Sequence, residues 1–146
     1  MANMFDSAGY NAITWSIGNL DNWDVSNITN MAYMFNRAGY SANTWSIGDL
    51  SNWNISKVRN LNLMFRQSGH KTQYWTVGDL SNWDTINVET LSMIFAGAGN
   101  SATTWSVGNI SNWDLSSLTN SACNAFLQLG TAATNNLASV KSAWGC

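Results

Sequence analysis

At residues 44–53 the chain reads TWSIGDLSNW, and close variants of this stretch stand at residues 14–23, 74–83 and 104–113. Neighbouring copies are always 30 residues apart, so every copy is under the same geometric constraint. A constant period of this kind is typical of repeat proteins, in which each unit stacks on the next. Two columns of tryptophan follow the period: Trp15, Trp45, Trp75 and Trp105, and then Trp23, Trp53, Trp83 and Trp113.

The copy from Thr44 to Tyr74 can be interpreted element by element. Trp45-Ser46-Ile47 alternates apolar and polar residues, which predicts a short strand. Gly48 and Asp49 predict a turn, and the alternation at Trp53-Asn54-Ile55 predicts a second short strand.

The rest of the copy predicts a short helix. Val58, Leu61, Met64 and Phe65 recur at helical spacing, Ser56 is placed to cap the start, and Gly69 is placed to end the segment. The predicted fold is an α/β repeat solenoid, a leucine-rich-repeat-like stack of about four 30-residue strand-turn-strand-helix coils with a C-terminal helical cap.

Both tryptophan columns are interpreted as structural core. They are in phase with apolar residues such as Ile17 and Val25, which a binding face would not need. A large aromatic ring also contributes much of the apolar area that a small core can bury. The alternative is an exposed stripe on which sugar rings stack.

Composition narrows the possible classes of protein. The chain has 146 residues, which suits one domain, and a formal charge of −2, which gives no basic face for nucleic acid. It contains no apolar run of about 18 residues, as a membrane helix would need. Residues 1–6 resemble no secretion signal. Cys123 and Cys146 are too few for a metal site, but they can form one disulfide if the protein works outside a cell.

The sequence NWDVSNITNMAYMF at residues 22–35 closely resembles the repeat of the BspA-like, leucine-rich-repeat-related bacterial surface proteins, W-D-[VT]-S-x-V-T-x-M-x-x-M-F. The resemblance extends to about Leu118 and is looser in the third copy, where Thr85 and Ile86 replace the Val-Ser pair. The present unit is a few residues longer than the family's, around Tyr40 to Thr44. The resemblance implies a solenoid that serves in surface display, adhesion or partner binding, and it carries no catalytic residues.

Two polar columns accompany the tryptophans. Asp24, Asn54, Asp84 and Asp114 are expected to point outward, either bridged by a cation such as Ca²⁺ or, as we favour, bonded to the following backbone turn. Asn22, Asn52, Asn82 and Asn112 are expected to form a ladder of amides along the stack, with a ligand-binding face as the sharper alternative.

Basic side chains concentrate in one copy, which breaks the symmetry of a nearly neutral chain. They are Lys57, Arg59, Arg66, His70 and Lys71, joined by Arg37 from the copy before. Lys57, Arg59, Arg66 and Lys71 are candidates for docking an acidic partner or an anionic glycan. Solubility of a charged helix face is the explanation that we favour. His70 is the only histidine and is interpreted as a loop substitution. We predict no catalytic residue, no cofactor and no resident metal.

The two ends of the chain differ. Residues 1–14 are interpreted as a partial first coil, 15–120 as the repeats and 121–146 as a C-terminal cap. Thr134 or Asn135 is expected to cap a last helix that carries Leu137, Val140 and Trp144 on one face. At the N-terminal end, Met1, Met4 and Phe5 occupy columns that later copies fill with core residues, so we expect them to form a contact surface.

Two functional classes follow. The first is a non-enzymatic structural or adhesive repeat protein of a cell surface or a virion, which binds other proteins or itself. The second is a carbohydrate-binding module that uses outward Asn, Asp and Tyr side chains, with a host-surface glycan as its partner. An extracellular or virion location fits both.

Overall fold

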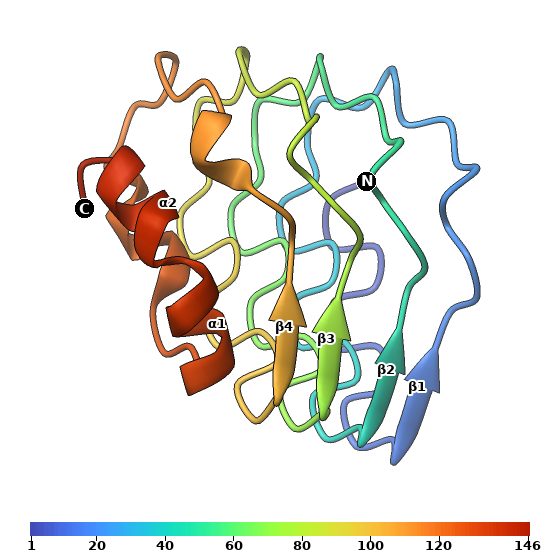
Figure 1. Ribbon diagram of the computed structural model, residues 1–146. Helices are drawn as coiled ribbons and strands as arrows, with labels where there is room; N and C mark the ends of the chain where they lie inside the picture. Colours follow the sequence, from blue (N-terminus) through green and yellow to red (C-terminus); the bar gives the residue numbers. More distant parts are fainter.

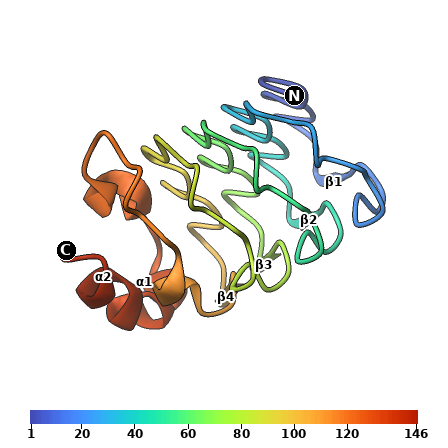
Figure 2. The same ribbon diagram turned by 90° about the horizontal axis from the view of Figure 1, so that it is seen from above.

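The computed structural model describes the backbone of residues 1–146 and the side chains of all of them except residues 135 and 136. Successive copies of the repeat lie side by side as a row of loops, with β1 at one end of the row and the helices of the C-terminal segment at the other (Figures 1 and 2). The element order therefore follows the repeat order along the chain.

Each TWS-type stretch forms a three-residue strand, as β1 (Thr14–Ser16), β2 (Thr44–Ser46), β3 (Tyr74–Thr76) and β4 (Thr104–Ser106). β1 pairs in parallel with β2, and β3 pairs in parallel with β4. The register joins residues 30 apart, for example Trp15 with Trp45. In every strand the central tryptophan is buried and its two neighbours are exposed, so the alternation in the sequence sets the two faces.

The second predicted strand, Trp53 to Ile55, does not form. The backbone turns there instead, because the Asn54 Oδ1 accepts a hydrogen bond of 3.1 Å from the Ser56 amide. Pairing resumes a few residues later, where isolated parallel bridges connect Asn30 with Asn60 and Asn60 with Thr90.

The predicted helix of each copy is also wrong. Residues 61–71 form consecutive turns, and Leu63, Gln67 and Gly69 have positive φ angles, which an α-helix excludes. Alternate amides from Leu61 to Gln67 donate to the next copy, as from Leu63 to the Ser92 carbonyl, and those of Gly69 and Lys71 donate to the preceding copy. Intervening amides such as that of Met64 donate three residues back. A helix would keep all of these bonds inside one copy and leave the neighbouring copy unpaired.

The turn segments supply the second wall of the core. Met31, Met34, Met64 and the phenylalanines point inward, which explains why their spacing resembles that of a helix. Five phenylalanines form one stacked column, with neighbouring ring centroids 5.5–6.0 Å apart: Phe5, Phe35, Phe65, Phe95 and Phe126.

The pattern ends in short helices: η1 (Ile110–Asn112), η2 (Ala122–Phe126), α1 (Thr131–Asn136) and α2 (Ala138–Ala143). Helix α1 packs against β4 and α2 packs against η1 (Figure 1). The predicted cap at Thr134 is wrong, because α1 begins at Thr131 and the Thr134 hydroxyl donates to the Gly130 carbonyl from inside the helix. The alternative cap, the Asn135 side chain, lies outside the described residues.

A disulfide between Cys123 and Cys146 ties the end of the chain to η2. The bond closes a loop with a sequence separation of 23 residues that contains both α-helices. This segment is therefore held to the last copy by a covalent link as well as by packing.

Candidate binding surfaces

The tryptophans of the second column connect neighbouring copies. The indole N–H of Trp53 donates to the Leu20 carbonyl at 2.8 Å, and Trp83 and Trp113 donate in the same way to Leu50 and Leu80. Trp144 repeats this contact at the C-terminal end, where it stacks on Trp113 with ring centroids 5.8 Å apart and donates to the Ile110 carbonyl. One side chain of the C-terminal segment thus takes the place of a further repeat.

The N-terminal end has no equivalent cover in this chain. Seven of the eight tryptophans predicted as core are buried, but Trp23 is 39% exposed, which corrects its assignment to the core. Among the described residues, Trp23 has one aromatic neighbour, Phe5, at 6.1 Å between ring centroids, and its indole N–H has no acceptor of the kind that Leu20 gives Trp53.

The first turn segment adds further apolar side chains to this N-terminal face. Met4 is 48% exposed although its column is buried in the later copies, while Met1 and Phe5 are half-buried. Ile13 is 76% exposed, but its column is exposed in every copy, so it does not belong to this end face. The outer edge of β1 lies at the same end of the row (Figure 1). The predicted contact residues Met1, Met4 and Phe5 are therefore together, and the face also includes Trp23, which lies beside Phe5.

The structure gives the predicted basic residues different neighbours. The Lys57 ammonium donates to the Asn27 Oδ1 at 2.7 Å, and Arg59 forms an ion pair with Glu89. Lys71 is exposed in the turn segment, and Arg66 is half-buried there beside a cavity. Arg37 and His70 contact neighbouring copies, through the Gln67 side chain and the Gly97 carbonyl respectively. Two of the four candidate docking cations are thus already paired within the chain.

The Asp and Asn column caps turns. The Oδ1 atoms of Asp24, Asn54, Asp84 and Asp114 each accept a hydrogen bond from the amide two residues further on. The Ser26 hydroxyl, followed by the Ser26 amide, lowers the pKa of Asp24 by bonding to its carboxylate, and Ser116 does the same for Asp114. Turn capping explains this column, and the described residues contain no group of three or more His, Cys, Asp or Glu side chains that could hold a metal ion.

A second column of Asp and Asn side chains, which includes Asp49 and Asp79, packs against glycines of the following copy. A Cβ atom built on Gly78 would lie 1.9 Å from the Asp49 Oδ1, and one on Gly108 would lie 1.8 Å from the Asp79 Oδ1. The side chain of one copy therefore occupies the space that a larger residue would need in the next. Asn22 does not take part in the predicted ladder of amides, because its Nδ2 donates a hydrogen bond to its neighbour Asp21.

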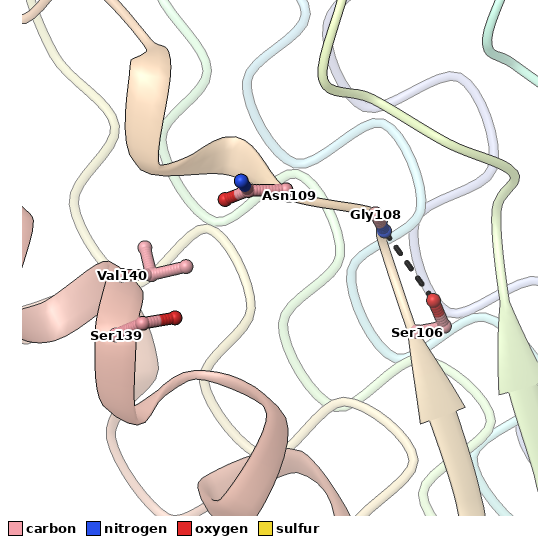
Figure 3. A pocket seen from close by; sticks show the side chains of 5 residues that line it. All are labelled: Ser106, Gly108, Asn109, Ser139 and Val140. Carbon is pink, nitrogen blue, oxygen red and sulfur yellow. Dashed lines mark hydrogen bonds between the residues drawn. The ribbon is translucent and has the colours of Figure 1, made fainter.

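At the last copy this packing leaves a small polar cavity, of about 240 Å³, between the end of β4 and helix α2 (Figure 3). Ser106, Gly108 and Asn109 line one side, and Ser139 and Val140 of α2 line the other. The Ser106 hydroxyl already accepts from the Gly108 amide at 3.3 Å, and the Asn109 Oδ1 accepts from the Ser111 amide. The cavity marks the seam between the repeats and the C-terminal segment, and no charged group lines it.

None of the described helices is both long and apolar enough to cross a membrane.

The repeated sequence, the 30-residue register of the strands and the stacked aromatic columns together define a repeat-family protein. Residues 1–138 match the family described as "Mycoplasma protein of unknown function, DUF285", and the chain belongs to this family. No curated protein and no solved structure shows significant similarity to the chain.

Proposed function

We propose that this chain is a non-enzymatic structural or adhesive repeat protein, a leucine-rich-repeat-like solenoid related to the BspA surface proteins, that binds a second copy of itself through its N-terminal face. The observation that carries the proposal is the exposure of Met4 and Trp23, whose columns are buried in the later copies, at the end of the row where β1 has an unpaired edge. Contiguous apolar surface of this kind favours association, and an unpaired strand edge favours pairing with another strand.

The difference between the two ends supports a twofold dimer. Trp144 and the helices already cover the last copy, so a head-to-tail contact would meet no matching open face. Two N-terminal faces are the same surface and can meet across a twofold axis, which closes the assembly. The two β1 strands would then run antiparallel, an arrangement that permits regular hydrogen bonding.

The proposed location is an extracellular surface or a virion. The Cys123–Cys146 disulfide supports this location because such bonds persist mainly in oxidising surroundings. The proposal assigns no catalysis: the aspartates of the turn column are engaged by their own backbone, and the imidazole of His70 contacts the Gly97 carbonyl.

Sedimentation velocity over a range of protein concentrations tests this dimer. The unmodified protein should sediment as a dimer at high micromolar concentration, and Met4→Asp and Met4→Lys should each convert it to a folded monomer, because either charge would face its own copy across the twofold axis. Tyr74→Asp is the matched control, because Tyr74 is also exposed but lies on β3. A monomer at all concentrations, or a dimer that survives both charged variants, would rule the proposal out.

The second candidate function is carbohydrate binding, and Tyr74 is the residue that favours it. Tyr74 is 67% exposed in a strand column where the other copies have Thr14, Thr44 and Thr104. An exposed tyrosine ring among hydroxyl groups is a surface on which a sugar ring can stack. A glycan array probed with the unmodified protein and with Tyr74→Ala separates the two functions, since binding that depends on Tyr74 is expected only of the carbohydrate-binding module.

A further inference from the structure

A second cavity, also of about 240 Å³, lies among the turn segments of the third and fourth copies and the chain after η2. Its lining residues are Arg66, Met93, Ala96, Leu127 and Gln128. They combine one cation and one amide with three apolar side chains. This composition differs from that of the seam at α2, which no charged group lines.

The cavity exists because one copy has small side chains where the others have larger ones. At the column of Ala96 the earlier copies have Asp6, Asn36 and Arg66, and at the column of Gly97 they have Ser7, Arg37 and Gln67. All members of the Gly97 column have positive φ angles, so this backbone conformation does not require glycine at that position. The absence of a side chain at Gly97 therefore opens space next to Ala96.

Hydrogen bonds and ring stacking hold the backbone around the cavity in place. Gly97 donates a hydrogen bond to the Leu127 carbonyl, and its own carbonyl contacts the Nδ1 of His70 at 2.9 Å. Phe126 stacks on Phe95 directly below, with ring centroids 6.0 Å apart. The backbone on both sides of the cavity is thus held by the same contacts that join the copies.

Arg66 is the unusual member of this site. It is half-buried, and within the described residues its guanidinium has neither an ion pair nor a hydrogen bond. No carboxylate is among the lining residues. A half-buried guanidinium that no described side chain engages is available to an anion that enters the cavity.

We propose that this cavity binds a small ligand with one carboxylate and a short apolar substituent. The planar guanidinium of Arg66 matches a carboxylate through two parallel hydrogen bonds. Met93, Ala96 and Leu127 cover the apolar substituent, and the Gln128 amide supplies a further polar contact at the rim. The volume is smaller than the about 300–1,000 Å³ of sites for drug-sized molecules, which limits the ligand to a single sugar or a short chain.

An acidic sugar and a short aliphatic acid share this chemistry. Titration calorimetry with sodium N-acetylneuraminate and with sodium hexanoate distinguishes them. Saturable binding of only one of the two probes identifies whether the ligand is an acidic sugar or an aliphatic acid. Binding of either probe supports the site when it depends on Arg66. If neither probe binds in a saturable way, the proposal is wrong.

Three variants and one control assign the binding to this cavity. Arg66→Gln should weaken the affinity about ten- to hundredfold, the value of a charged hydrogen bond. Arg66→Lys should weaken it less, because the charge remains but the planar fork is lost. Ala96→Asn, which copies the residue at Asn36, should fill the cavity and abolish binding while the protein stays folded by circular dichroism.

Lys57→Gln removes the same charge at a site where the cation is bonded to Asn27, and it should leave the affinity unchanged. Equal affinity of the unmodified protein and Arg66→Gln, or an equal loss in Lys57→Gln, would show that the probes respond to net charge and would overturn the proposal.

Discussion

Trp83, in the second tryptophan column, has one partner in the preceding copy and one in the following copy. The indole of Trp83 stacks on Trp113 with ring centroids 6.0 Å apart, while its N–H group donates to the Leu50 carbonyl. An aromatic ring combines a large apolar area with one polar atom, so burial is favourable only when that atom has a partner. The repeat provides the partner from the neighbouring copy, which explains why leucine and tryptophan recur together.

Replacement of Trp53 by alanine should therefore cost about 3–5 kcal/mol in the free energy of unfolding, the usual range for a buried aromatic residue. Trp23→Ala should cost clearly less, because Trp23 is 39% exposed and begins its column. Denaturant unfolding of both variants measures the difference. Equal costs would mean that burial within the stack is not what stabilises the second column.

The aspartates of the turns make stability depend on pH. Bonds from Ser26, Ser81 and Ser116 lower the folded-state pKa values of Asp24, Asp79 and Asp114 below their ordinary range. A lowered pKa contributes stability above the unfolded pKa of about 4, and this contribution is lost as the pH falls through the folded value. The melting temperature should thus decrease on acidification below about pH 4.

Asp24→Asn, Asp79→Asn and Asp114→Asn combined in one chain provide the control. The amide oxygen can still accept the turn hydrogen bond, as Asn54 does, but it does not titrate in this range. The decrease in melting temperature between pH 5 and pH 2 should become smaller in this variant. An unchanged decrease would assign the acid sensitivity to other carboxylates.

At the scale of elements, the sequence predicted the first strand of each copy well and the rest of the copy poorly. Trp45-Ser46 has an alternation that only a strand explains, and the structure places β2 there. The spacing of Leu61, Met64 and Phe65 fits both a helix and consecutive turns, since each turn also returns the chain to the core after three or four residues. Only the positive φ angles distinguish the two, and at Leu63 and Gln67 no glycine signals them.

Of the candidate sites, the sequence predicted the N-terminal surface but not the cavity at Arg66. Met1, Met4 and Phe5 could be predicted as a surface because their columns are core residues elsewhere in the sequence. The cavity at Arg66 depends on Leu127 and Gln128, which are shifted by one residue relative to the repeat, so alignment of the columns alone did not place them beside Ala96. The signal that was available was the small size of Ala96 and Gly97 within their columns.

The C-terminal segment depends on its disulfide. The chain-entropy model gives about 3 kcal/mol for a loop of this length, so Cys146→Ser should destabilise the segment by about that amount. Because Trp144 lies two residues before Cys146 and covers Trp113, the loss should expose both rings. Quenching of tryptophan fluorescence by acrylamide measures this exposure. An unchanged quenching profile would show that packing of α2 suffices without the bond.

At the scale of the whole molecule, contacts join each copy to the copies beside it. Amides of residues 31–37 donate to carbonyls near residues 60–66, and amides of residues 61–67 donate to carbonyls near residues 90–96. A structure with only nearest-neighbour contacts gains about the same stability from each added unit. Its length is then set by the number of copies and not by a closed core.

Insertion of a duplicate of residues 61–90 directly after Thr90 should therefore give a folded and more stable protein. The duplicate begins with Leu61, which has the same position in its copy as Leu91, so every column continues across both junctions. Both the midpoint and the denaturant dependence of unfolding should increase, since the longer stack buries more surface.

A duplicate of residues 61–75 at the same place is the control, because half a period puts Trp75 beside residues of a different column. This shorter insertion should lower the midpoint, since the Phe95 ring would leave the column in which it stacks on Phe65, and the duplicated amides of residues 61–67 would no longer face a turn segment of the following copy. If both insertions destabilise the protein equally, the copies do not act as interchangeable units. If the full duplicate alone is tolerated, the 30-residue period is the unit of stability in this chain.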